Sequence, residues 1–160
     1  EIYPDIIYVC IGYGDEEENI KNLVEQLNLS NQVIFLKNIS NDLKNALVAS
    51  SNVFVMPSII DKKSVEGFGI AYIEAAQFGV PSLGGKDGGE SDAIVHEKTG
   101  LICDGSSLDE IYSSIDKLLK YLFKSININF IVTSKVSHNK PFLFLSLKFT
   151  LPNFTQKIIW

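Results

Sequence analysis

Short apolar runs alternate with amphipathic stretches along the first 122 residues of the chain. The run DIIYVCIG, residues Asp5–Gly12, is almost continuously apolar, as expected of a parallel strand that is buried on both faces. The stretch that follows begins with acidic residues and then carries apolar side chains at helical spacing, at Ile20, Leu23, Val24 and Leu27. This part of the chain is therefore predicted to form a strand and then a helix.

The same alternation continues to residue 122 and predicts a series of strand–helix units. Strands are expected near residues 6–11, 33–36, 53–56, 81–84 and 101–103. Of the helices between them, NDLKNALVAS has Asn41 as its expected cap, and FGIAYIEAAQFG is expected to end at Gly79. Strands separated by helices favour βαβ units, so the predicted fold class is α/β with a doubly wound parallel sheet.

The composition changes at Phe123. All nineteen Asp and Glu residues lie at or before Asp116, whereas residues 123–160 contain five Lys and six of the ten Phe. Three interpretations are open: a basic and aromatic segment for a membrane surface, two or three strands that include ININFIVT, or translation in the wrong frame. We favour the third. The expected organisation is thus one domain over residues 1–122 and an atypical tail over residues 123–160, unstructured or out of frame.

Charge and composition exclude several classes of function. The formal net charge is −5 and the pI is near 5.0, so the chain has no basic footprint for nucleic acid. No apolar run reaches the length of a membrane span, and no leader peptide is visible at Glu1. The two cysteines, Cys10 and Cys103, lie in apolar stretches without metal-ligand spacing, which predicts buried thiols and no metal site.

The segment SVEGFGIAYIEAAQFGVPSLGGKDGG, residues 64–89, carries the candidate chemistry. A strand ends near Pro57, and a helix is expected to begin near Phe68 or Gly69. The N–H groups of its first turn and the helix dipole would form a site for a phosphate. Gly67 and Gly69 would let a ligand approach the backbone closely.

Two glutamates flank this predicted anion site. A carboxylate beside a phosphate would repel it, so Glu66 more plausibly accepts hydrogen bonds from a neighbouring polyol. Glu74, one to two turns into the helix, could reach a second diol. Two diols that flank a diphosphate describe a nucleotide sugar. The plainer alternative remains that glycine turns before helices are common and that Glu74 is a solvated helix residue.

A set of spaced motifs strengthens this interpretation. They are Glu66-x7-Glu74, Gly79-Val-Pro81, Gly88-Gly89 followed by Asp92, and Thr99-Gly100-Leu101. In combination they resemble the carboxy-terminal, donor-binding domain of retaining GT-B glycosyltransferases of family 4, over about residues 5–120. The resemblance implies the Rossmann-like half of a GT-B fold. It also points to enzymes of cell-envelope polysaccharide and glycolipid synthesis, and the sequence of the motifs is most similar to that of phosphatidylinositol mannoside mannosyltransferases.

The resemblance also implies roles for individual residues. Glu66 would be the catalytic residue that holds hydroxyls of the donor sugar, and Glu74 would bind the ribose. The remaining donor-binding residues would be Gly67, Phe68, Gly69 and Ile70 around the diphosphate and sugar, and Asn38, Ile39 and Ser40 along the base. The substrate would be a UDP- or GDP-sugar, without a metal or another cofactor.

The chain departs from the family pattern in what it omits. The family's first strand, with a turn that carries Arg and Lys, should precede residue 1, and this strand is central in the order 3-2-1-4-5-6. ININFIVT (Ile126–Thr133) could fill that position, but a poorly packed tail is the favoured prediction. An amino-terminal domain for a lipid or polysaccharide acceptor is likewise missing.

We therefore expect a glycosyltransferase fragment that is inactive alone. Its expected location is cytoplasmic or peripheral at the inner membrane. The alternatives are an inert or binding-only remnant of a GT-B protein and a GT-B sugar-nucleotide epimerase.

Overall fold

The computed structural model describes residue 3 and residues 5–59, 69–123 and 130–133. The strands are β1 (Ile7–Ile11), β2 (Val33–Leu36), β3 (Val53–Met56), β4 (Ser82–Gly85), β5 (Gly100–Cys103) and β6 (Phe130–Thr133). The helices are α1 (Glu17–Gln26), α2 (Asn41–Ala49), α3 (Ile70–Gln77), α4 (Glu90–Ala93) and α5 (Leu108–Phe123). The five strands predicted before residue 122 are all present, each within two residues of its expected bounds.

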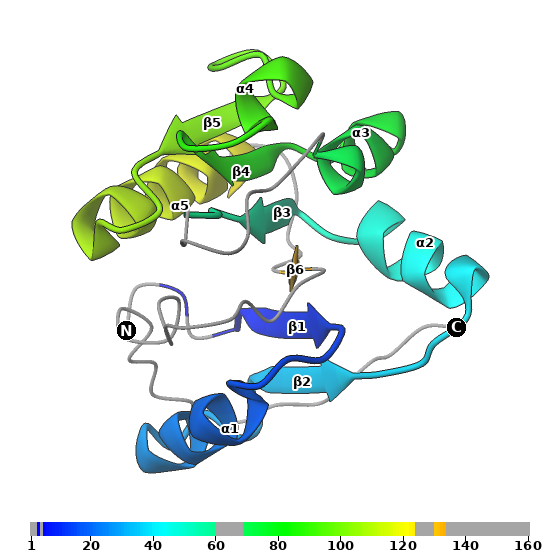
Figure 1. Cartoon of the computed structure of the whole chain (residues 1–160), viewed down its shortest axis with the longest axis vertical. Coiled ribbons are helices and arrows are strands. Elements are labelled where there is room, and N and C mark those ends of the chain that lie inside the picture. The colour runs from blue at the N-terminus through cyan, green and yellow to red at the C-terminus, as the bar shows by residue number, and fades with distance from the viewer. Residues whose placement is uncertain (1–2, 4, 60–68, 124–129, 134–160) are drawn as a thin grey trace.

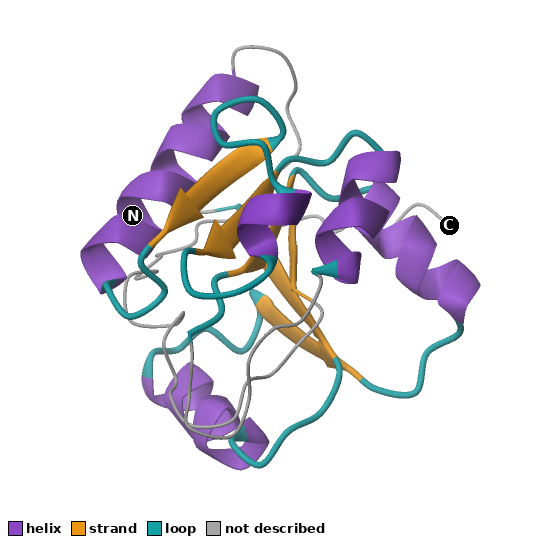
Figure 2. Ribbon diagram, turned by 45° about the horizontal axis from the view of Figure 1, so that its top comes forward, coloured by secondary structure: helices purple, strands orange, loops and turns teal. Residues whose placement is uncertain are grey.

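The six strands form one parallel sheet in the order β2-β1-β6-β3-β4-β5 (Figure 1). Helices cover both of its faces (Figure 2). Apolar side chains of α1 and α5 pack in one hydrophobic cluster, and those of α2 and α3 pack in the other. This arrangement confirms the predicted α/β class with a doubly wound sheet.

Side chains of the inner strands alternate between the two clusters. In β1, Tyr8 and Cys10 belong to the cluster with α1 and α5, whereas Val9 and Ile11 belong to the cluster with α2 and α3. Because successive side chains of a strand point to opposite faces, a strand covered on both faces must be apolar throughout. The continuous apolar run that predicted this strand is explained by that burial. Burial also raises the pKa of the Cys10 thiol to about 12.

Strand β6 corrects one prediction. It lies between β1 and β3 and pairs in parallel with both, with Ile131 opposite Tyr8 on one side and Val53 on the other. The sequence favours a poorly packed tail over this strand, and for residues 130–133 that prediction is wrong. An empty position at the centre of the sheet would leave buried N–H and C=O groups of β1 and β3 without partners. The sequence FIVT has the β-branched and aromatic composition that suits such a position.

The remainder of the tail, residues 134–160, lies outside the described residues, as do residues 124–129. Helix α5 continues through Phe123, so the expected domain boundary at residue 122 falls at the end of a helix. That boundary stays a prediction. Within the described part of the chain, no helix has both the length and the apolar character that crossing a membrane requires.

Candidate functional site

The carboxyl ends of the parallel strands meet at one edge of the sheet, and in open α/β sheets this is the edge where ligands bind. The loops that leave this edge include those from β2 to α2 and from β3 towards α3, together with those from β1 to α1, from β4 to α4 and from β5 to α5. The predicted site residues that the structure describes lie in the first two of these connections or in the helices after them. The topology therefore brings the 38–40 loop and the start of α3 to the same edge.

Gly69 begins α3 in a conformation that favours glycine. Its φ is +62°, in the left-handed region, and it occupies the N-cap position of the helix. A Cβ atom at this position would lie 2.7 Å from the Tyr72 Cδ2 atom, closer than carbon atoms pack. Both constraints therefore disfavour a side chain at Gly69. Of the N–H groups in the first turn, that of Tyr72 donates to the Gly69 carbonyl.

Tyr72 fixes the position of α3 on the sheet. Its ring is buried and meets the ring of Phe54 edge-on, with centroids 5.8 Å apart and an interplanar angle of 85°. Its hydroxyl donates to the carbonyl of Met56, the last residue of β3. Sequence reasoning missed Tyr72, although its helical spacing to Ala75, which is also buried, was a usable signal.

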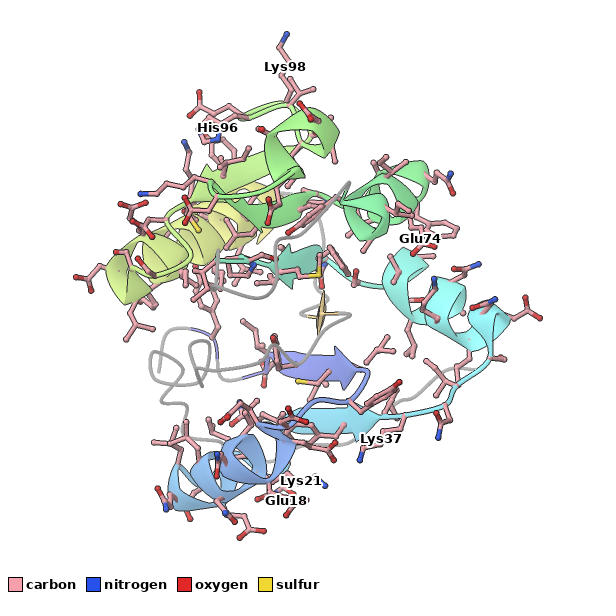
Figure 3. The ribbon with its side chains drawn as sticks, in the orientation of Figure 1. Glu18, Lys21, Lys37, Glu74, His96 and Lys98 are labelled. Atoms are coloured by element: carbon pink, nitrogen blue, oxygen red, sulfur yellow. The ribbon has the colours of Figure 1, made fainter. Side chains whose placement is uncertain are left out.

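Glu74 has a specific partner. Lys44, the fourth residue of α2, places its Nζ atom 2.9 Å from each of the two carboxylate oxygens of Glu74. Figure 3 shows Glu74 on α3, on the side that faces α2. The Glu74 side chain is 38% exposed and that of Lys44 is 24% exposed, so the pair is accessible from solvent without being freely solvated. The Glu74 carboxylate is thus paired with a lysine of a neighbouring helix while it stays in contact with solvent.

The loop between β2 and α2 contains Asn38, Ile39 and Ser40, which the resemblance placed along a base. Asn38 adopts a left-handed backbone with φ of +52°, and Ile39 packs against the hydrophobic cluster of α2 and α3. Ser40, not Asn41, caps α2: its Oγ atom accepts a hydrogen bond from the Leu43 N–H at 3.2 Å. The cap lies one residue earlier than predicted because Ser40 has the extended backbone that a capping residue requires.

Three of the predicted site residues, Glu66, Gly67 and Phe68, lie outside the described residues. The described residues therefore give no distance between Glu66 and Glu74 across the expected anion site. Ile70 is the first residue of α3, and its side chain is exposed. Of the predicted group, the structure brings Gly69, Ile70 and Glu74 together on α3.

Two further ion pairs brace the carboxyl edge, and sequence reasoning had assigned neither. Lys86, after β4, lies 2.6 Å from a carboxylate oxygen of Asp104, after β5. The Lys86 ammonium, and after it Ser106, holds the pKa of the Asp104 carboxyl well below its usual range. Lys37, after β2, lies 2.6 Å from the carboxylate of Glu17 at the start of α1.

Glycine at the end of β4 allows another close approach at this edge. A Cβ atom on Gly85 would overlap the carbonyl oxygen of Ser58, which follows β3. Glu90, the first residue of α4, is fully buried beside Gly84. No cluster of three or more His, Cys, Asp or Glu side chains that could hold a metal ion occurs in the described portions of the chain.

Comparison with known proteins gives this edge a context. The family model for glycosyl transferases group 1 matches residues 1–122. A GDP-mannose-dependent alpha-(1-6)-phosphatidylinositol monomannoside mannosyltransferase of Mycolicibacterium smegmatis is 32% identical over 118 residues, which cover 72% of this chain and 31% of that protein. An alpha-1,3/1,6-mannosyltransferase of Neurospora crassa, alg-2, is 35% identical over 121 residues, covering 73% of this chain and 25% of that protein.

Solved structures of other proteins match the fold of this chain. Anabaena Alr3699/HepE in complex with UDP matches with a TM-score of 0.62 and 24% identity, over 76% of this chain and 33% of that one. Sucrose-phosphate synthase from Thermosynechococcus elongatus matches with a TM-score of 0.60 and 24% identity, over 71% of this chain and 29% of that one. The chain thus spans about a third or less of the length of these relatives. It belongs to the glycosyl transferases group 1 family and has the fold of the Rossmann-like half of a GT-B glycosyltransferase.

Proposed function

We propose that this chain is the donor-binding portion of a retaining, family 4 GT-B glycosyltransferase. In this proposal a nucleoside-diphosphate sugar lies along the carboxyl edge of the sheet, and Glu74 accepts hydrogen bonds from the ribose hydroxyls. The observation that carries the proposal is the Glu74 carboxylate, which is held on α3 beside α2 and is still 38% exposed. A carboxylate in this position has acceptor capacity left for a diol.

The diphosphate is proposed to lie at the start of α3. The first N–H groups of a helix have no intrahelical partner and carry the positive end of its dipole. Gly69 permits the left-handed turn that begins α3, and its missing Cβ atom leaves room for the Tyr72 ring. Glu66 is proposed to hold hydroxyls of the donor sugar, by resemblance to the family, and the 38–40 loop is proposed to lie along the base.

The donor is proposed to be a UDP- or GDP-sugar. The relatives named above include a GDP-mannose-dependent enzyme, and the Anabaena structure contains UDP. The acceptor is proposed to be a lipid or a polysaccharide, held by a further amino-terminal domain of a longer protein, with peripheral contact to a membrane. The relatives supply that idea, since one of them acts on a phosphatidylinositol monomannoside.

Calorimetric titration of UDP and GDP into the 160-residue chain tests the proposal. One of the two should bind, and Glu74→Gln should weaken it by roughly 1.5–3 kcal/mol, the contribution of a charge-assisted hydrogen bond. Glu66→Gln serves as the matched control: it is placed at the sugar, so it should leave nucleoside-diphosphate binding nearly unchanged. A folded wild-type chain that binds neither nucleotide would overturn the proposed function. Equal losses in the two variants would overturn the assignment of roles.

A further inference from the structure

We propose that Lys44 is a positioning residue of the donor site, which orients the Glu74 carboxylate for the ribose diol. This inference rests on the proposed function above. Lys44 Nζ lies 2.9 Å from Glu74 Oε1 and 2.9 Å from Glu74 Oε2, so the ammonium is centred on the carboxylate. The contact joins two helices whose paired residues lie 30 positions apart in the sequence.

The stereochemistry of a carboxylate makes this arrangement suitable for a diol. An ionised carboxylate has two oxygens and about four lone-pair positions. Lys44 takes one position on each oxygen and leaves one on each for another donor. Adjacent ribose hydroxyls offer two O–H donors with a similar separation. The ammonium therefore restricts the rotation of the Glu74 carboxylate and leaves an acceptor position on each of its oxygens.

Helix stability does not account for a lysine at this position. Lys44 lies at the end of the first turn of α2, and a cation near a helix N-terminus is disfavoured by the dipole. Asp42 and the Ser40 cap are the residues of this turn that match the dipole. An ion pair that is partly exposed also contributes little to the stability of a fold. Among the described residues, the ion pair that the structure gives the Lys44 side chain is the one with Glu74.

The same residue connects two parts of the proposed site. The 38–40 loop, proposed to lie along the base, leads directly into α2, and its last residue caps that helix. Lys44 is one turn further along α2 and holds Glu74 on α3. A shift of α2 would therefore move both the 38–40 loop, proposed to lie along the base, and the Glu74 carboxylate, proposed to bind the ribose.

A comparison of two ligands separates positioning from general attraction. The wild-type chain and Lys44→Met are titrated with the nucleoside diphosphate that the wild-type chain binds and with its 2′,3′-dideoxy analogue. Lys44→Met should weaken the natural ligand by about tenfold, the equivalent of one charge-assisted hydrogen bond, and leave the analogue unchanged. Lys44→Arg, which keeps the charge and can contact both oxygens, should retain most of the affinity.

Two further variants complete the design. The double variant of Lys44→Met with Glu74→Gln should bind no more weakly than whichever single variant has the lower affinity. The reason is that both substitutions remove the same interaction. Lys98→Met is the matched control: Lys98 is exposed and points away from the sheet (Figure 3), so its loss should not change binding. Circular dichroism and thermal melting show that each variant is folded.

Each alternative result contradicts the inference. Equal losses for the natural ligand and the dideoxy analogue would mean that Lys44 attracts the diphosphate. Tighter binding by Lys44→Met would mean that Lys44 masks Glu74 and must leave. An unchanged affinity would mean that the pair has no role in binding. If the wild-type chain binds neither ligand, the proposed function itself fails, a result distinct from the other three.

Discussion

Two glycines with left-handed backbones make a direct comparison possible at the residue scale. Gly69 and Gly79 have φ values of +62° and +72°. A Cβ atom on Gly79 would meet nothing within 4 Å, whereas on Gly69 it would lie 2.7 Å from the Tyr72 ring. Gly79→Ala should therefore cost about 1–2 kcal/mol of stability from backbone strain alone. Gly69→Ala should cost more, because the buried Tyr72 ring must also move.

Urea unfolding of the two variants checks this prediction, with the midpoint and slope fitted separately. Gly69→Ala should also weaken nucleotide binding, while Gly79→Ala should not, since only Gly69 lies at the start of α3. Equal losses of stability in the two variants would show that the Tyr72 ring gives way without cost.

The pair of Lys86 and Asp104 predicts a dependence of stability on pH. Lys86 first, and then Ser106, lowers the pKa of the folded Asp104 carboxyl below its ordinary value of 3.8. A carboxyl whose pKa is lower in the folded state stabilises the fold above its ordinary pKa, and this contribution is lost as the pH falls further. Asp104→Asn should therefore lower the melting temperature at pH 7, and the difference from the wild-type chain should shrink below about pH 4.

Thermal melts of the two proteins from pH 7 down to pH 3 measure this difference. A gap that stays constant over the whole range would mean that Asp104 stabilises the loop by its hydrogen bonds to Ser106, and not through its charge.

At the scale of single elements, β6 yields the sharpest prediction. Its backbone pairs with β1 and with β3, so a proline at Ile131 would remove an N–H from the interior of the sheet. An unsatisfied buried backbone group costs about 1–3 kcal/mol, and Ile131→Pro should lose at least that much stability. Ile131→Val keeps the N–H and is the matched control. If both variants unfold at the same urea concentration as the wild-type chain, β6 is not a strand of the folded sheet in solution.

The elements differ in how far the sequence could predict them. The strands β1 to β5 follow from short apolar runs between helical patterns, because burial on both faces leaves a local signal in the composition. The composition of Ile126–Thr133 makes it a candidate for the central position, but composition alone does not decide between a strand and a poorly packed tail. The position of β6 depends on unpaired backbone groups of β1 and β3, which lie far from residues 130–133 in the sequence. The rest of the sheet therefore decides between the two interpretations that the composition of this segment leaves open.

The residues of the candidate site also differ in how far the sequence could predict them. Gly69 and Glu74 could be found from the sequence, because a glycine before a helix and a spaced pair of glutamates are local patterns. Tyr72 and Lys44 could not be assigned their partners, because their contacts span 16 and 30 positions. These two residues place Glu74: one attaches α3 to β3, and the other attaches the carboxylate to α2.

At the scale of the whole molecule, the edge of one sheet can bind a donor, but transfer requires a second substrate at a defined distance. Holding two reactants in the correct geometry can supply about 7–11 kcal/mol of the barrier, and a site that holds one of them supplies none of that contribution. The chain spans 31% of the length of the Mycolicibacterium relative, and its described residues form one Rossmann-like unit. We therefore expect the 160-residue chain alone to bind a nucleotide sugar without transferring it.

Incubation with radiolabelled UDP- and GDP-sugars, together with lipid and oligosaccharide acceptors, measures this directly. Labelled product should stay at the level of a blank without protein, while calorimetry on the same sample detects nucleotide binding. Joining the chain to the amino-terminal portion of a relative should restore transfer, and Glu74→Gln in that fusion should raise the donor KM more than it lowers kcat, because the ribose is remote from the reacting carbon. Transfer by the 160-residue chain alone would show that one Rossmann-like unit holds both substrates, and the division of donor and acceptor between two domains would then not apply to this protein.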